Sequence, residues 1–238
     1  KARQPVYEDK IVKINNGRLE STEFKLSIHG FEFLTHTSKV KNFYDSRDVE
    51  ENCYYEVEQL IKEKIHCEEV LVFDHTIRTS NEAILSEYRV REPVKAVHND
   101  YTTKSAPQRL RDLLTEHGAK KALKRRFAIV QLWRPIETIE SEPLAICDGR
   151  TIPEEGFITV ERRYPYRTAE VFHISYNPKH KWIYFPQMTP KEALIFKVVD
   201  TDASAGVKYT AHSAFEDPNT PVKAKARESI EIRALALF

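Results

Sequence analysis

His98 and Asp100 are separated by one residue, and a second histidine, His212, lies in a later segment with strand character. Two imidazoles and one carboxylate can bind one face of an octahedral metal and leave the opposite positions open, as in non-haem Fe(II) oxygenases that admit a cosubstrate and O₂. Residues i and i+2 of a strand point to the same side, so His98 and Asp100 can reach one ion while Asn99 faces away. We therefore predict that His98, Asp100 and His212 bind iron and form the catalytic centre.

Arg227 and Ser229 would share one face of a later strand. A guanidinium can hold a carboxylate through two parallel hydrogen bonds, and a hydroxyl can add another. The pair predicts an anchor for a dicarboxylate near the metal. Gln131 interrupts an apolar run at residues 129–133, and a buried amide needs hydrogen-bond partners. It either faces the active cavity and contributes to cofactor binding or bonds to the backbone.

Other residues compete for the metal-ligand roles. A His-x-acid triplet alone is a weak signal, and His66-Cys67-Glu68 is a second example. That triplet falls at the end of a predicted helix, where residues i and i+2 do not share a face. His173 and His180 are alternative third ligands, although neither is followed by an arginine at a comparable position.

An interpretation without a metal assigns purely structural roles to the same residues. His98 is then a core histidine bonded to backbone, Asp100 a turn acceptor and Arg227 a surface ion-pair residue. The same residues are compatible with two alternative functions. One is a zinc-dependent hydrolase that uses the same ligands, and the other is a non-catalytic jelly-roll binding module with structural histidines.

The composition excludes several classes of protein. The chain has 238 residues, of which 41% are hydrophobic and 31% charged, and its formal net charge is +1. These values are typical of a globular protein and indicate neither nucleic acid nor membrane as a partner. The near-neutral charge disfavours a polymeric polyanion and leaves a small-molecule substrate open. The basic run at residues 120–126 is explained by a solvated helix end. A homodimer is possible only on the general ground that homodimers are the commonest oligomers of soluble proteins.

The three cysteines are widely spaced and form no Cys-x-x-Cys pair, so we expect reduced thiols in an intracellular, cytoplasmic protein. Residues 1–5 lack the apolar core of a signal peptide. The six glycines form no Walker loop or dinucleotide fingerprint.

Many short strands must position the candidate residues. We expect early strands at residues 23–28 and 30–34, a long helix at 48–65, a strand at 69–73 and a helix at 107–118. Short strands then follow at residues 127–134, 144–147, 157–161, 171–176, 182–185, 194–199, 209–215 and 229–237. This pattern predicts a mainly β fold with flanking helices and a jelly-roll core. We expect one domain over residues 1–238, in which residues 1–90 pack on a metal-binding β-core formed by residues 91–238.

Several motifs together resemble one oxygenase family, which contains the cephem 7α-methoxylase component, gibberellin desaturase-like proteins and an endoperoxide-forming meroterpenoid oxygenase. The resemblance covers nearly the whole chain. It is carried by the segments at residues 30–32, 43–45, 72–78, 97–102, 130–135, 143–148, 182–188 and 227–233.

The resemblance implies a double-stranded β-helix (jelly-roll, cupin-like) fold and an Fe(II)/2-oxoglutarate-dependent dioxygenase of secondary metabolism that uses O₂. It implies that an oxidant formed at iron abstracts hydrogen, with hydroxylation, desaturation, ring formation or endoperoxidation as the outcome. The same metal ligands are implied, with Arg227 and Ser229 on the distal carboxylate of 2-oxoglutarate. We assign Tyr101, Arg109 and Trp133 to the substrate wall as a hypothesis. If Arg109 or Arg134 faces the cavity, a carboxylate-bearing substrate is favoured.

Overall fold

The computed structural model describes residues 6–88, 90–164, 167–202, 204 and 206–238. Residues 1–5, on which the signal-peptide expectation rests, lie outside the described residues. In the described ranges no helix has both the length and the apolar character needed to cross a membrane.

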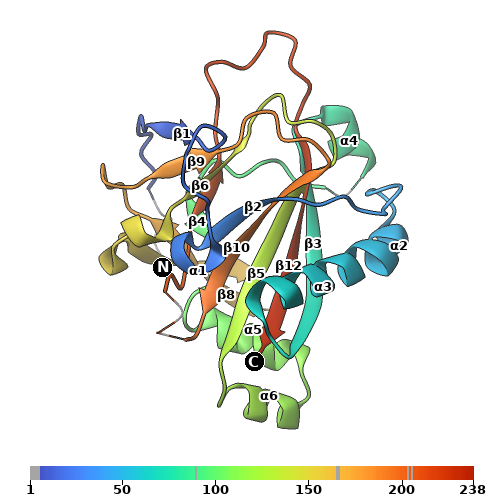
Figure 1. Ribbon diagram of the computed structural model, residues 1–238, viewed down its shortest axis with the longest axis vertical. Helices are drawn as coiled ribbons and strands as arrows, with labels where there is room; N and C mark the ends of the chain where they lie inside the picture. Colours follow the sequence, from blue (N-terminus) through green and yellow to red (C-terminus); the bar gives the residue numbers. More distant parts are fainter. Residues whose placement is uncertain (1–5, 89, 165–166, 203, 205) are drawn as a thin grey trace.

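The strands of the described residues form two sheets, and every pairing except β1 with β9 is antiparallel. The seven-stranded sheet has the order β1 (Ile14–Asn16), β9 (Trp182–Tyr184), β6 (Leu144–Cys147), β11 (His212–Ala214), β4 (His98–Asn99), β8 (Arg167–Ile174) and β7 (Phe157–Tyr164). The five-stranded sheet has the order β2 (Phe31–Thr35), β10 (Glu192–Asp200), β5 (Phe127–Pro135), β12 (Glu228–Leu237) and β3 (Glu69–Thr79). In Figure 1, β10, β5, β12 and β3 run side by side behind α3.

Side-chain alternation along β5 explains the layers. Ile129 and Trp133 belong to an apolar core that also contains Ile146 and Ile183 of the seven-stranded sheet, so this face of β5 looks toward the other sheet. The intervening residues 130 and 132 belong to a second core that packs under α3. The predicted helix at 48–65 is confirmed as a π-helical turn (Val49–Cys53) followed by α3 (Tyr54–Ile65). Its Ile61 is fully buried in that second core.

The predicted strand at residues 23–28 is wrong. Residues Leu26–His29 form the short helix α1, which ends at Gly30 in the left-handed conformation with φ 86°. Glycine adopts this angle without a Cβ clash, so it ends a helix well. The His29 side chain also accepts a hydrogen bond from the Lys25 amide at 3.0 Å, which stabilises the turn.

The predicted helix at 107–118 is two helices, α5 (Ser105–Leu113) and α6 (Glu116–Ala122). Leu114 is extended between them, and the Thr115 hydroxyl caps α6 by accepting from the Gly118 amide. Residues 120–121 occupy the last turn of α6, as expected for cations at a helix end. The remaining helices are α2 (Ser46–Asp48) and α4 (Glu82–Glu87), and 3₁₀ turns lie at Gly149–Thr151 and Glu154–Gly156.

The later strands agree closely with the expectations from the sequence. β6 has the predicted bounds, and β5 and β12 each differ by one residue, whereas β11 is shorter than the predicted segment at 209–215. Cys53, Cys67 and Cys147 are buried and unpaired, as predicted.

Candidate functional site

The seven-stranded sheet brings together the three predicted metal ligands. His98 lies directly opposite His212 in the β4–β11 pairing, and their ring centroids are 4.4 Å apart. Asp100 follows β4, and its Oδ1 lies 3.7 Å from His98 Nε2. The chain thus folds residues more than a hundred positions apart into one cluster of two imidazoles and one carboxylate. Asn99 instead donates to the Val198 carbonyl at 2.7 Å, which ties β4 to β10.

The backbone fixes the tautomer of the neutral His98 ring. Its Nδ1 lies 2.7 Å from the Ala96 carbonyl oxygen, and because that oxygen only accepts, Nδ1 carries the proton. In this tautomer the lone pair belongs to Nε2, which lies on the side of Asp100. A donated hydrogen bond of this kind orients a histidine for metal binding.

His212 is suited to bind a cation in its neutral form. Burial and the neighbouring His98 lower the pKa of His212 to about 3, so the ring is neutral near pH 7. Within the described residues its Nδ1 is buried without a hydrogen-bond partner. Burial by itself would raise the pKa of Asp100, but Arg233 and the two histidines hold it well below its usual range. The candidate donors thus include a neutral imidazole, that of His212, and an anionic carboxylate, that of Asp100.

No group of three or more His, Cys, Asp or Glu side chains is already arranged around a cation position in the part of the chain that the structure describes. Asp100 already accepts a hydrogen bond from Arg233 through Oδ2 at 3.2 Å, which leaves Oδ1 on the side of His98. The ligand set therefore remains a prediction that rests on proximity and donor chemistry.

His173 is the competing third ligand. It pairs with His98 from β8, but the two ring centroids are 6.5 Å apart. Both of its ring nitrogens are buried without partners among the described residues. His212 lies closer to His98 and also influences Asp100. The geometry therefore favours His212, while His180 lies beside Trp182 and away from this pair.

This choice predicts different effects for two histidine variants. His212→Ala is expected to weaken Mn(II) binding by at least about a hundredfold, because a direct ligand contributes more than an outer partner. His173→Ala is expected to change the affinity by less than about threefold. Calorimetric titration of metal-free protein measures both, and the reverse order would assign the third ligand to His173.

Arg227 and Ser229 meet as predicted. Arg227 Nε donates to Ser229 Oγ at 2.9 Å, and Nη1 donates to the Glu142 carbonyl at 3.0 Å. The guanidinium lies 5.0 Å from the centroid of the Trp133 ring. Arg227 is only 1% exposed and forms no ion pair with any described residue. Burial lowers the pKa of Arg227 to about 10, so the side chain keeps its charge near pH 7.

Glu231 and Glu142 act on this buried cation only from beyond ion-pair distance, so an anionic ligand in direct contact would stabilise it further. The Trp133 indole N–H adds a second buried donor that has no partner within the described residues. This corner of the site therefore has the chemistry to bind a carboxylate.

Gln131 lies on the same inward face of β5 as Trp133. Its Nε2 donates to Glu231 Oε2 at 3.3 Å rather than to the backbone, and its Oε1 has no partner in the described part of the chain. Glu231 also accepts two hydrogen bonds from Arg78, at 2.9 and 3.2 Å. The sequence reasoning did not identify Glu231, Arg78 or Arg233, although their segments carried the family resemblance.

Tyr101 and Arg109 are neighbours beside Asp100. Arg109 Nε donates to the Tyr101 hydroxyl at 2.9 Å, and its guanidinium lies 5.2 Å from the Phe73 ring centroid. Arg109 is half-buried and forms no ion pair among the described residues. Arg134 differs, because it alternates with Trp133 on β5 and donates to the His36 and Pro190 carbonyls. It therefore faces away from the candidate site.

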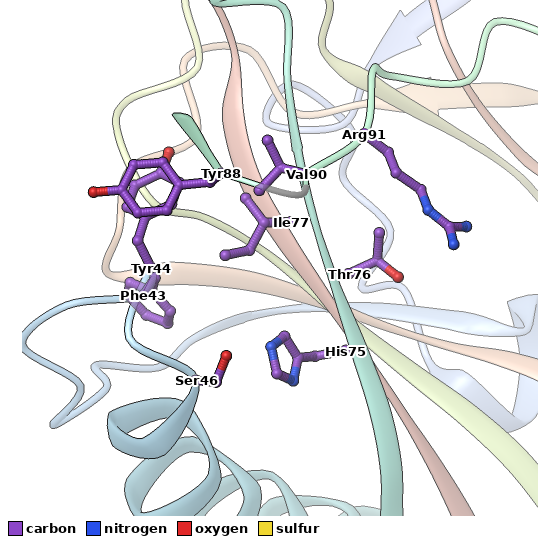
Figure 2. Close-up of a pocket in the computed structure, with 9 residues that line it drawn as sticks. All are labelled: Phe43, Tyr44, Ser46, His75, Thr76, Ile77, Tyr88, Val90 and Arg91. Atoms are coloured by element: carbon purple, nitrogen blue, oxygen red, sulfur yellow. The ribbon is translucent and has the colours of Figure 1, made fainter. Parts of the chain in front are cut away.

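Two surface cavities lie apart from these ligands. The first, of about 330 Å³, opens beside β3, and Figure 2 shows His75 and Ile77 on one side of that strand and Thr76 on the other. The second, of about 520 Å³, lies against residues 217–221. Neither is lined by His98, Asp100 or His212.

The chain is similar in sequence to known proteins. A family model described as "YDMC: Oxidoreductase/YMDC permease-like domain" matches residues 1–237. The "Hydroxylase/desaturase efuI" of Hormonema carpetanum is 31% identical over 98% of this chain and 85% of its own length. The "Fe(II)/2-oxoglutarate-dependent dioxygenase nvfI" of Aspergillus novofumigatus is 30% identical over 94% of this chain and 82% of its own.

Solved structures are similar as well. A structure titled "iron and alpha-ketoglutarate-dependent endoperoxidase NvfI with different conformation" superposes with a TM-score of 0.86 and 29% identity. The match covers 95% of this chain and 83% of that one. The mainly β architecture with two sheets is therefore shared with a solved protein.

Proposed function

Because this chain belongs to the family of fungal hydroxylases, desaturases and α-ketoglutarate-dependent dioxygenases that includes these relatives, we propose that His98, Asp100 and His212 bind its Fe(II). The chain is an Fe(II)/2-oxoglutarate-dependent oxygenase of secondary metabolism that acts on a small molecule. The ligand assignment is supported by the close approach of the two imidazoles and by the free Nε2 of His98.

The single observation that carries the cosubstrate site is the buried guanidinium of Arg227 beside Ser229, which forms no direct ion pair with the residues that the structure describes. 2-Oxoglutarate is a dicarboxylate, so its distal carboxylate would satisfy this cation and accept from the hydroxyl. Gln131 and Trp133, which both lie on β5, would provide further polar contacts to the cosubstrate. We also propose that the two sheets form one double-stranded β-helix, or jelly-roll, domain in which these residues face inward.

Bound iron and 2-oxoglutarate would supply oxidising power by coupling the decarboxylation of 2-oxoglutarate to succinate with the reduction of O₂. The chain itself contributes position and exclusion of water. Arg227 and Ser229 hold the cosubstrate at one end, and the Ala96 carbonyl keeps His98 in the tautomer that leaves Nε2 free. The apolar residues between the sheets, including Ile129 and Ile146, keep the surroundings dry.

Succinate formation tests this function against the zinc-hydrolase and binding-module alternatives. Metal-free protein supplied with Fe(II), 2-oxoglutarate and O₂ is expected to form succinate slowly even without its substrate. Protein supplied with Zn(II) should form none, because zinc has no redox chemistry. Absence of succinate with Fe(II), in protein that binds the metal, would contradict the oxygenase assignment.

The contacts of Arg109 support a carboxylate-bearing substrate. Its guanidinium is half-buried beside Tyr101 and has no ionic partner among the described residues. Arg109→Ala is expected to weaken substrate binding by about tenfold to a hundredfold, because it removes a charge-assisted hydrogen bond. Arg134→Ala should leave substrate affinity near the parent value, since Arg134 faces away from the candidate site and donates to the His36 and Pro190 carbonyls.

A panel of small acids and their methyl esters measures this effect through substrate-stimulated succinate formation. Equal stimulation of the parent and Arg109→Ala by the preferred acid would contradict the carboxylate assignment.

A further inference from the structure

The guanidinium of Arg233 lies among three carboxylates from separate segments. Its Nε donates to Asp100 Oδ2 at 3.2 Å, its Nη1 to Asp74 Oδ1 at 2.9 Å and its Nη2 to Glu231 Oε1 at 2.5 Å. The residue is 8% exposed. Arg233 therefore connects β12 and β3 of the five-stranded sheet with the loop that follows β4 of the other sheet.

Neighbouring strands hold Arg233 in place. Arg233 lies opposite Asp74, and Glu231 lies opposite Thr76, in the β12–β3 pairing. The Thr76 hydroxyl accepts from Arg233 at 3.4 Å. Glu231 is itself fixed by its two hydrogen bonds from Arg78. Arg233 is thus clamped on the side away from Asp100, which makes it a rigid support.

The two oxygens of Asp100 consequently face different partners. Oδ2 accepts from Arg233, whereas Oδ1 lies on the side of His98 Nε2, 3.7 Å away. A carboxylate held this way can offer one oxygen to a metal but not both. Such outer contacts commonly fix the orientation of a metal ligand and affect metal affinity.

We propose that Arg233 is a positioning residue that fixes Asp100 as a one-oxygen ligand of the metal. This inference rests on the proposed function, because it assumes that Asp100 binds the metal. Arg233 itself does not touch the metal or the reacting atoms. Its contribution is to hold one oxygen of Asp100 away from the ion and to direct the other toward the His98 side.

Titration of metal-free protein with Mn(II), by calorimetry and electron paramagnetic resonance, tests the proposal. Arg233→Lys keeps the charge but loses the forked geometry that contacts three carboxylates. It is expected to weaken Mn(II) binding by about tenfold to a hundredfold and to change the resonance spectrum of bound Mn(II). Arg78→Lys is the matched control, because it changes the same network at a residue that does not contact Asp100. It should stay within about threefold of the parent, with the parent spectrum.

Parent-like affinity and spectrum in Arg233→Lys would overturn the proposal, and so would an equal loss in both variants. If circular dichroism shows that Arg233→Lys does not fold, Asp74→Asn replaces it, since Asp74 is a more exposed anchor of Arg233. That variant is expected to bind Mn(II) several-fold more weakly with an altered spectrum, and parent-like values would again overturn the proposal. Asp100→Asn distinguishes failure of the Arg233 proposal from failure of the proposed metal site. Unchanged Mn(II) binding in that variant would refute the metal site itself.

Discussion

His98→Ala is expected to lower the affinity of the protein for Fe(II) by at least about a hundredfold and to abolish succinate formation. His98 is the central residue of the cluster, since it lies opposite His212 and beside Asp100. Loss of an outer-shell partner already reduces metal affinity by roughly tenfold to a hundredfold, so loss of a direct ligand should cost at least as much. Anaerobic calorimetry measures the affinity, and circular dichroism reports whether the variant folds.

His66→Asn is the matched control for this experiment. His66 belongs to the other His-x-acid triplet but ends α3 in the left-handed conformation, with φ 51°. Asparagine tolerates this conformation, so the substitution should leave the fold intact. Fe(II) affinity is expected to match the parent. Retained Fe(II) affinity in folded His98→Ala would show that the metal does not bind at this cluster.

Arg227→Met is expected to raise the concentration of 2-oxoglutarate needed for half-saturation by roughly a hundredfold. The substitution keeps a flexible apolar side chain against Trp133 and removes the cation. Removing one partner of a buried charge pair costs about 2–5 kcal/mol, and 1.4 kcal/mol corresponds to tenfold in affinity. Arg227→Lys should recover part of the affinity, because it restores the charge without the fork.

Two control measurements make this prediction specific. Fe(II) affinity in the absence of 2-oxoglutarate should be unchanged in Arg227→Met, since Arg227 is not among the proposed ligands. Arg134→Met alters a buried arginine on the opposite face of β5 and should leave the 2-oxoglutarate requirement near the parent value. A parent-like requirement in Arg227→Met would place the cosubstrate carboxylate elsewhere.

Local sequence patterns predicted the central strands well. β5 and β6 are largely apolar segments, and β12 contains regularly spaced apolar residues, which is typical of strands whose two faces are buried. The same patterns failed at residues 23–28, where alternation over six residues was outweighed by the helix end at Gly30. They also missed the break at Leu114, because the apolar spacing continues across it.

The proximity of His98 and Asp100 was expected from strand periodicity, although β4 ends at Asn99 and Asp100 lies just beyond it. Long-range register, which pairs His98 with His212, required the structure. The Arg233 network was missed for a related reason. Charged residues that alternate with apolar ones, as in β12, usually indicate an outward face, whereas Glu231 and Arg233 face inward. There Arg233 pairs with Asp74 and Asp100, and Glu231 pairs with Arg78. Only the arrangement of the two sheets reveals those partners.

The most direct measurement of the central claim is an anaerobic titration of metal-free protein with Fe(II) and then with 2-oxoglutarate. The parent is expected to develop a weak visible metal-to-ligand charge-transfer band when the cosubstrate chelates the metal. His98→Ala should give no band, and Arg227→Met should need far more 2-oxoglutarate to reach the parent intensity. Folded parent protein that gives no band at saturating 2-oxoglutarate would contradict an iron and 2-oxoglutarate site in this chain.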